Sequence, residues 1–451
     1  MGSGRSGELV GTRSPDPAAA RAVLRVGWRA RLTGAGAPLA HRGFRLHLAA
    51  RLLSWTGSAV APLALAFAAL HIGGGPRALG LVLAAGVVPQ LAALPVGGVV
   101  ADRLDRARVM VWSNLACAFA EATAVALLAS GAARVWQLAV MAGVCGAAGA
   151  FFAPAADGAV AEVVPAGQWH TANALLKFGQ NTGKAASPAL GGVLIAAAGP
   201  AWAIGWDAVT FAASAALFAR AGALPRTVRP RAAFTADLRQ GWYEVRCRRW
   251  LGVMVCQAAL IGPAWLAGYQ LLGPLYGERV LGGAGPWGVV VSAFTAGLIA
   301  GAVLALVWRP SGAGVTVCAG TGALALPLAV IAARIPLPVL VAAMLPAGAG
   351  LEVAMVVWAS LLQERIPADR LGRTLSYSTL GQTLPVPVAY LLTGPAVELL
   401  GLRTTLGAAA ALITTAAVLP LALPQVRALT LAPAEQAGPA PAPRGGVPRR
   451  P

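Results

Sequence analysis

Charged side chains are scarce in this chain, and acidic ones are the scarcest. Charged residues make up 11% of the 451 residues, and only 16 positions are Asp or Glu. Hydrophobic residues make up 57%, and they recur in runs of about twenty residues from end to end. This composition excludes an ordinary soluble domain and predicts a protein that crosses a lipid bilayer many times.

Residue types that bind metals or form disulfides are few and scattered. The five cysteines show no Cys-x-x-Cys spacing and fall mostly in apolar runs, where a thiol behaves as a small hydrophobe. The four histidines lie near predicted helix ends, away from one another, whereas a metal site needs clustered ligands. We therefore expect neither a metal site nor a disulfide framework.

A nucleotide-binding loop is missing as well. Residues 179–184 resemble a phosphate loop, but three residues separate Gly179 from Gly183 where that motif has four, and Ala185 follows Lys184 where it has Ser or Thr. The net charge of +19 does not indicate nucleic-acid binding, because a soluble domain with interleaved basic and aromatic residues is lacking. The sequence thus predicts no nucleotide and no nucleic-acid partner.

The apolar runs form two sets of six, separated by a basic segment. We expect an all-α membrane protein with twelve transmembrane helices in two six-helix bundles, over residues 46–219 and 251–423. Residues 220–250 would be a basic linker, and residues 1–45 and 424–451 would be tails. Since Lys and Arg are retained on the cytoplasmic side, the loop charges place the linker and both termini in the cytoplasm. This pattern predicts a multi-pass protein of a cell membrane, such as the bacterial inner membrane.

The stretch from Gly98 to Arg108 packs five charges into seven residues between two apolar runs. Asp102 would lie at the end of a helix, where the helix dipole disfavours a negative charge, so its carboxylate should seek a cation or the N-terminus of another helix. For the neighbouring arginines, the alternative is a short solvated turn that obeys the positive-inside rule.

This charged stretch resembles the loop between the second and third helices of the major facilitator superfamily. The residues that match the family pattern G-x-L-A-D-R-x-G-R-R are Gly98, Ala101, Asp102, Arg103 and Arg106. The resemblance covers about residues 45–425 and implies the two-bundle fold and secondary transport by alternating access.

The same resemblance implies a conformational gate on the cytoplasmic side. Asp102 would dock against the start of helix eleven, and two arginines would bridge to an acid on helix four, for which Asp157 is the candidate. The gate residues would be Gly98, Asp102, Arg103, Arg106, Asp157, Gly372 and Arg373.

A second motif lies on the fifth predicted helix and resembles the antiporter pattern G-x-x-x-G-P-x-x-G-G, which that family associates with export. The matching positions are Gly183, Ser187, Pro188, Gly191 and Gly192, with Ser187 in place of a glycine. Ordinary close packing of small residues between membrane helices is the alternative. The turns at residues 164–174 and 363–373 are similar to those of drug exporters, including macrolide and enterobactin efflux proteins.

Charges inside the predicted helices are candidates for proton coupling, because each is costly to bury and is usually paired or functional. Glu352, in the middle of helix ten, is the first choice, and Glu121 and Asp207 follow. The three acids appear dispersed along the sequence, and structural pairing is the alternative for each. Similar transporters often carry an acid after a glycine in helix one, where this chain has Gly57 and Ser58.

Aromatic and amide side chains at mid-membrane depth suit a mostly apolar pocket for an amphipathic molecule. The substrate-cavity candidates are Trp55, Gln180, Asn181, Gln257, Trp265, Tyr269, Trp358, Tyr377 and Gln382, with Gln270 and Tyr390 at similar depth.

Together these features predict a secondary transporter, not an enzyme. It would export a small amphipathic compound, a drug or a secondary metabolite, as a monomer in the lipid bilayer and in exchange for protons. Its partners would be that compound and the lipids, with no cofactor other than the proton gradient. The alternatives are an uncoupled or importing permease, or an intramembrane enzyme, for which the sequence offers no clustered nucleophile or metal ligands.

Overall fold

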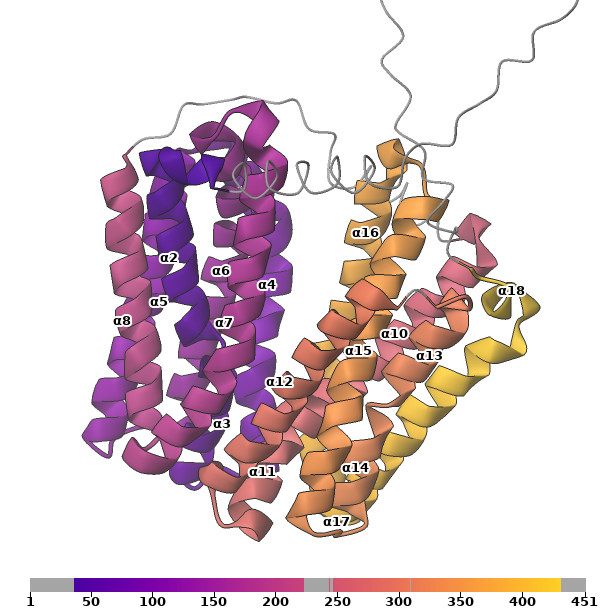
Figure 1. The fold of residues 1–451 in the computed structure, drawn as a ribbon. Coiled ribbons are helices and arrows are strands. Elements are labelled where there is room, and N and C mark those ends of the chain that lie inside the picture. The colour runs from indigo at the N-terminus through magenta and orange to yellow at the C-terminus, as the bar shows by residue number, and fades with distance from the viewer. Residues whose placement is uncertain (1–35, 223–242, 244–245, 309, 431–451) are drawn as a thin grey trace, which may run out of the picture.

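The computed structural model describes residues 36–222, 243, 246–308 and 310–430, and it leaves out some side chains inside these ranges. The described chain is built of helices that run roughly parallel to one another in two bundles (Figure 1). The predicted all-helical fold is therefore confirmed.

The first half contains six crossings. The first crossing is broken at Ala59 and Val60, and Pro62 is the second residue of its second segment. The helices of this half are α2 (Arg42–Ser58), α3 (Ala61–His71), α4 (Pro76–Arg103), α5 (Arg106–Ala129), α6 (Val135–Val163), α7 (Trp169–Ala198) and α8 (Pro200–Ala221), with short turns η1 (Ala37–Ala40) and η2 (Ala166–Gln168).

The second half begins with a crossing that contains two π-helical turns, a local widening that is frequent at functional sites. That crossing comprises α10 (Arg249–Leu266), η3 (Ala267–Leu272), α11 (Gly273–Tyr276) and η4 (Gly277–Leu281). The helices that follow are α12 (Ala284–Val307), α13 (Ala313–Gly322), α14 (Ala325–Ala332), α15 (Leu337–Arg365), α16 (Ala368–Thr383) and α17 (Val386–Val418), with η5 (Leu419–Ala422) and α18 (Pro424–Arg427) at the end.

Ten segments of the described residues are long and apolar enough to cross a membrane. One of them, Tyr377–Ala422, has 46 residues, far more than the roughly 20 that one crossing needs. Within it, Gly401 leaves the helical conformation at φ 82° and ψ 158°, so α17 consists of two arms joined by a turn. With these two arms counted separately and α7 included, the described residues make twelve crossings.

We call the side where α2 and α10 begin and α8 ends the linker side, and the opposite side the distal side. The halves meet at the distal side through α4 with α17 and α7 with α12. Gly80 lies against the backbone of Tyr390, and the guanidinium of Arg77 forms an ion pair of 2.7 Å with Glu398. Toward the linker side the two bundles diverge (Figure 1).

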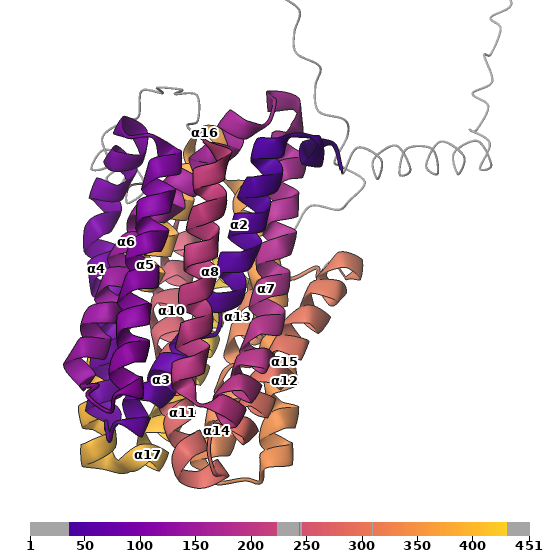
Figure 2. The same cartoon turned by 90° about the vertical axis from the view of Figure 1, so that its left-hand side faces the viewer.

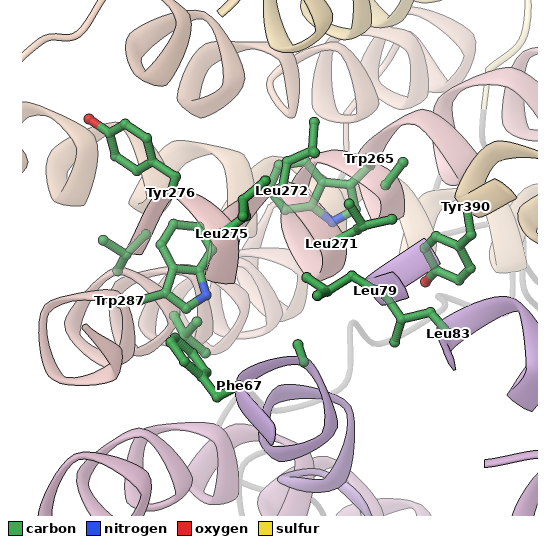
Figure 3. Packing of buried hydrophobic residues seen from close by; sticks show 14 of the residues in the cluster. Phe67, Leu79, Leu83, Trp265, Leu271, Leu272, Leu275, Tyr276, Trp287 and Tyr390 are labelled. Atoms are coloured by element: carbon green, nitrogen blue, oxygen red, sulfur yellow. The ribbon is translucent and has the colours of Figure 1, made fainter. Parts of the chain in front are cut away.

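A hydrophobic core spans both halves near the distal side. Phe67 of α3 lies beside Trp287 of α12, and Leu79 of α4 lies beside Leu271 (Figure 3). All four side chains are buried, so separating the halves here would expose a large apolar area. This core holds the described conformation closed on the distal side.

Candidate functional site

A central cavity of about 540 Å³ lies between the halves and draws most of its lining from the first. Its wall is largely apolar, as expected for a site that accepts an organic molecule. The polar and aromatic groups that line it include Trp55, Gln90, Asn114, Glu121, Asp207, Gln270 and Tyr390, together with Ser54, Ser58, Ser113, Phe152 and Phe211.

Two acidic side chains meet on the wall of this cavity. Glu121 comes from α5 and Asp207 from α8; they are 3% and 1% exposed, and their carboxyl groups face each other within hydrogen-bonding reach. The hydroxyl of Thr210 donates to Asp207 Oδ1 over 3.2 Å, and Cys145 Sγ lies 4.0 Å from Glu121 Oε1. Two negative charges this close in an apolar span would repel, and a proton held between the carboxyl groups relieves that repulsion.

The close approach of α2 to α8 fixes the position of this acid pair. Gly57 of α2 lies directly against the Asp207 carboxylate and the Thr210 hydroxyl, and any side chain at position 57 would displace them. Similar transporters often carry an acid after this glycine on helix one. Here the neighbouring helix supplies a carboxyl group at the same level.

The expectation that the three acids are dispersed is wrong for Glu121 and Asp207. The expectation failed because α5 and α8 lie far apart in the sequence. Only the register in which these two helices pack decides which of their side chains meet. Glu352 is half-buried in the middle of α15. It lines neither this cavity nor either of the two smaller cavities described below. Of the three acids, the structure thus places Glu121 and Asp207 at the central cavity and Glu352 away from it.

Two smaller cavities lie beside the central cavity, one within the second half and one between the halves. One, of about 230 Å³, is lined by Gln257, Trp265, Trp358 and Gln382. The other, of about 250 Å³, shares Ser58 and Gln270 with the central cavity and adds Tyr269 and Trp287. The rings of Trp265 and Tyr269 stack at 5.0 Å between the two, which provides a flat aromatic wall.

The predicted cavity residues are therefore divided among three spaces. Trp55 lines the central cavity, Tyr269 lines one small cavity, and four residues line the other. Among the described residues, Gln180 and Tyr377 line none of the three; Gln180 instead accepts a hydrogen bond from Lys177. Asn181 lies outside the described residues.

Sequence reasoning missed Gln90 and Asn114, which both line the central cavity. Both are polar side chains inside apolar runs, so the criterion that selected Glu121 would have found them. Tyr390 donates a hydrogen bond of 2.7 Å to Gln270 and thereby ties α17 to the π-helical turn η3.

The charged stretch lies where α4 ends and α5 begins. α4 continues to Arg103, and the side chain of Asp105 accepts a hydrogen bond of 2.8 Å from the backbone of Ala107 and caps α5. Arg106 pairs with Glu162 over 2.6 Å and donates to the carbonyl of Gly158. The stretch thus joins the start of α5 to the linker-side end of α6.

The predicted bridge from Arg106 to Asp157 is wrong, because Glu162 lies deeper and closer to the start of α5. Asp157 instead pairs with Arg51 of α2 over 3.4 Å. Arg103 is exposed and has interactions of its own. The side chain of Asp102, and the predicted docking positions Gly372 and Arg373, lie outside the described residues.

The ion pair between Arg106 and Glu162 is largely buried, with side chains 16% and 5% exposed. We expect Arg106→Ala to lower the free energy of unfolding by about 3 kcal/mol, because a buried carboxylate loses a charged partner. Thermal unfolding of the purified protein in detergent measures this loss. Arg108→Ala is the control: its side chain is 81% exposed and 4.0 Å from Asp105, so it should cost less than about 0.5 kcal/mol. Equal effects of the two substitutions would contradict the assignment.

The glycines of the second motif lie at helix contacts. A Cβ at Gly183 would lie 3.3 Å from the Cβ of Trp55, and Gly191 packs directly against Val60. A Cβ at Gly192 would lie 2.7 Å from the Cα of Gly288 in α12, which belongs to the other half. Ser187 and Pro188 lie outside the described residues. The motif therefore brings α7 against the first crossing and, at its distal end, against the second half.

Two six-helix bundles that close over a central cavity at one side define a membrane transporter. The model of one transporter family, described as transmembrane secretion effector, matches residues 33–444. The chain therefore belongs to this family of the major facilitator superfamily, a family of transporters and not of enzymes.

Comparisons with individual proteins agree with this assignment. An uncharacterized MFS-type transporter of Bacillus subtilis, YfiS, is 31% identical over 157 residues, which span 35% of this chain and 36% of that relative. The nucleoside transporter NupG has the same fold, with a TM-score of 0.66 and 13% identity over 84% of this chain and 98% of its own. An auto-inhibited POT family peptide transporter matches at 0.66 and 12% identity, over 88% and 99%.

Proposed function

We propose that this transporter exports a small amphipathic compound, a drug or a secondary metabolite, from the cytoplasm in exchange for protons. The observation that carries the proposal is the pair of Glu121 and Asp207 on the wall of the central cavity. A proton on the pair and a bound compound beside it would compete for the same place. Such competition is the physical basis of exchange.

The cavity supports an amphipathic substrate. Most of its lining is apolar, and the amides of Gln90, Asn114 and Gln270 offer hydrogen bonds at separate points of the wall. Beside this cavity, the stacked rings of Trp265 and Tyr269 add a flat surface to the two smaller cavities. This arrangement suits a molecule with an extended apolar body and few polar groups.

The conformation supports loading from the cytoplasm. The distal side is closed by the core around Phe67 and Trp287 and by the contact of Gly192 with Gly288. The arginines at the turn from α4 to α5 lie on the linker side, so the positive-inside rule assigns that side to the cytoplasm. The helix-five motif, which resembles that of antiporters, favours export over uptake.

Everted membrane vesicles test the proposal, because their outer face is the cytoplasmic face. With an acid interior, vesicles that contain the transporter should accumulate at least one of ethidium, tetraphenylphosphonium and erythromycin, and nigericin, which collapses the pH gradient, should stop the accumulation. Vesicles without the transporter are the control. Uptake that resists nigericin and valinomycin together and stops at equal concentrations on the two sides would indicate an uncoupled permease. Accumulation only in right-side-out vesicles would indicate an importer. If no compound accumulates in either orientation, the proposal is overturned.

A further inference from the structure

A stripe of buried polar side chains runs between α2 and α8, which lie side by side along their length (Figure 2). On α2, His47, Ala50, Ser54 and Gly57 follow one another on one face at helical spacing, and two of them, His47 and Ser54, carry polar side chains. On α8, the same holds for the polar residues Asp207, Thr210 and Ser214, which are at most 1% exposed. We call the contact between these two faces the α2–α8 seam.

The register of the seam is set by two contacts. At the linker side the ring of His47 meets Phe218 edge to face, with 5.5 Å between the ring centroids. At mid-membrane, Gly57 lies against Asp207 and Thr210. The helices are antiparallel, so Ser214 lies between these two levels. Along α8 it is about one helical turn from Thr210 and one from Phe218, which lies at the level of His47. The seam thus leads from His47, near the start of α2, to the acid pair.

Unpartnered polar atoms concentrate along this path. Seven buried side-chain nitrogen or oxygen atoms of the described residues have no hydrogen-bond partner. Three of them belong to the seam: both ring nitrogens of His47 and Ser214 Oγ. Two more, Asp207 Oδ2 and Glu121 Oε2, belong to the acid pair, where a shared proton would join the carboxyl groups. An unpartnered buried polar atom is costly, and water is the usual group that satisfies it.

We propose that the α2–α8 seam is a proton path, in which water molecules between His47 and Ser214 connect the acid pair to the linker side. Each transfer moves one proton along a hydrogen bond. The carboxyl pair gives its proton to the chain of water and hydroxyl groups, and the imidazole accepts a proton on one nitrogen and releases one from the other. His47 and Ser214 end each cycle as they began it.

A separate path is useful to an exchanger. A bulky compound in the central cavity covers the face of the acid pair that lines this cavity, and the displaced proton then needs another exit. The seam approaches Asp207 from the side of α2. Its residues Ser54 and Asp207 also line the central cavity, whereas His47, Thr210 and Ser214 do not. The charged groups nearest the path are Arg51 on α2 and its partner Asp157 on α6, and the acid pair itself on α5 and α8.

The test replaces His47 by Leu and Ser214 by Ala, and it rests on the proposed function. In everted vesicles with an acid interior, each substitution should slow proton-driven accumulation of the fastest compound of the panel about fivefold, as expected for the loss of one hydrogen-bonded step. Exchange of labelled for unlabelled compound without a pH gradient should stay within about twofold of the wild-type rate, because that exchange needs no net proton transfer.

If His47 only fills space between α2 and α8 and carries no proton, the opposite result is expected. Replacing an unpartnered buried imidazole by an apolar side chain should then leave the unfolding midpoint unchanged or raised and leave transport intact. His71→Leu, at the exposed end of α3, is the matched control for loss of a histidine. Wild-type coupling together with wild-type rates in both variants would overturn the proton path alone. If the wild type shows no proton-driven accumulation, the proposed function fails and the path fails with it.

Discussion

Asp207→Asn, and likewise Glu121→Gln, should reduce proton-driven accumulation by about a hundredfold or more, the effect that losing a positioned proton-transfer group typically has. Each variant keeps the size of the side chain and leaves a single carboxyl group at the site. One carboxyl group has no like charge beside it, so the repulsion that favours a shared proton is gone. Exchange of labelled for unlabelled compound without a gradient should survive, since the cavity keeps its shape.

Glu352→Gln is the matched comparison for this result. It also removes one carboxyl group from a membrane helix, but Glu352 is half-buried in α15 and lies outside the cavity that holds the pair. We expect its effect on coupled transport to be smaller by about tenfold or more. Loss of coupling in Glu352→Gln, with coupling retained in both variants of the pair, would transfer the proton site to α15.

Gly192→Ala should slow transport about tenfold or more by disfavouring the conformation that is closed on the distal side. The added Cβ would lie 2.7 Å from the Cα of Gly288, and neither backbone can yield without separating the halves. Overpacking of this kind costs about 1–3 kcal/mol, which corresponds to a population shift of roughly 5- to 150-fold toward the opposite conformation. Gly205→Ala is the control, since its Cβ would meet Val125 at an ordinary 3.7 Å.

Cys145 reports this shift directly, because it lines the central cavity. In a variant that keeps only this cysteine, a membrane-impermeant maleimide should react faster from the linker side. Gly192→Ala should move the reactivity toward the distal side, and Gly205→Ala should leave it unchanged. If Gly192→Ala left both the transport rate and the side of labelling as in the wild type, the contact with Gly288 would not hold the distal side closed.

The crossings could be predicted from the sequence because each is a local apolar run. Helix ends were less predictable. The charged stretch contains the polar residues that usually follow a helix, yet α4 extends through it to Arg103, and α5 starts only where Asp105 provides a cap. Local chemistry thus determined how many helices form, and the capping residue determined where one of them begins.

The candidate site could be predicted only in part, because its geometry depends on contacts between distant helices. Glu121 and Asp207 were recognised as costly charges, but nothing local to either shows that α5 and α8 bring them together. The partner of Arg106 was misassigned for a similar reason: Asp157 and Glu162 lie on the same helix, and only the packing of α5 against α6 selects Glu162. His47 and Ser214 carried no signal until the antiparallel register of α2 and α8 aligned them.

Exchange of a compound for a proton at the acid pair is the central claim, and proton movement in everted vesicles tests it most directly. A pH-sensitive dye is trapped in vesicles with an acid interior, and a transported compound is added outside. The interior should become less acid at a rate that follows uptake of the compound, and Asp207→Asn should abolish this response. Uptake by the wild type with no change in interior pH, or an equal response in Asp207→Asn, would contradict the claim.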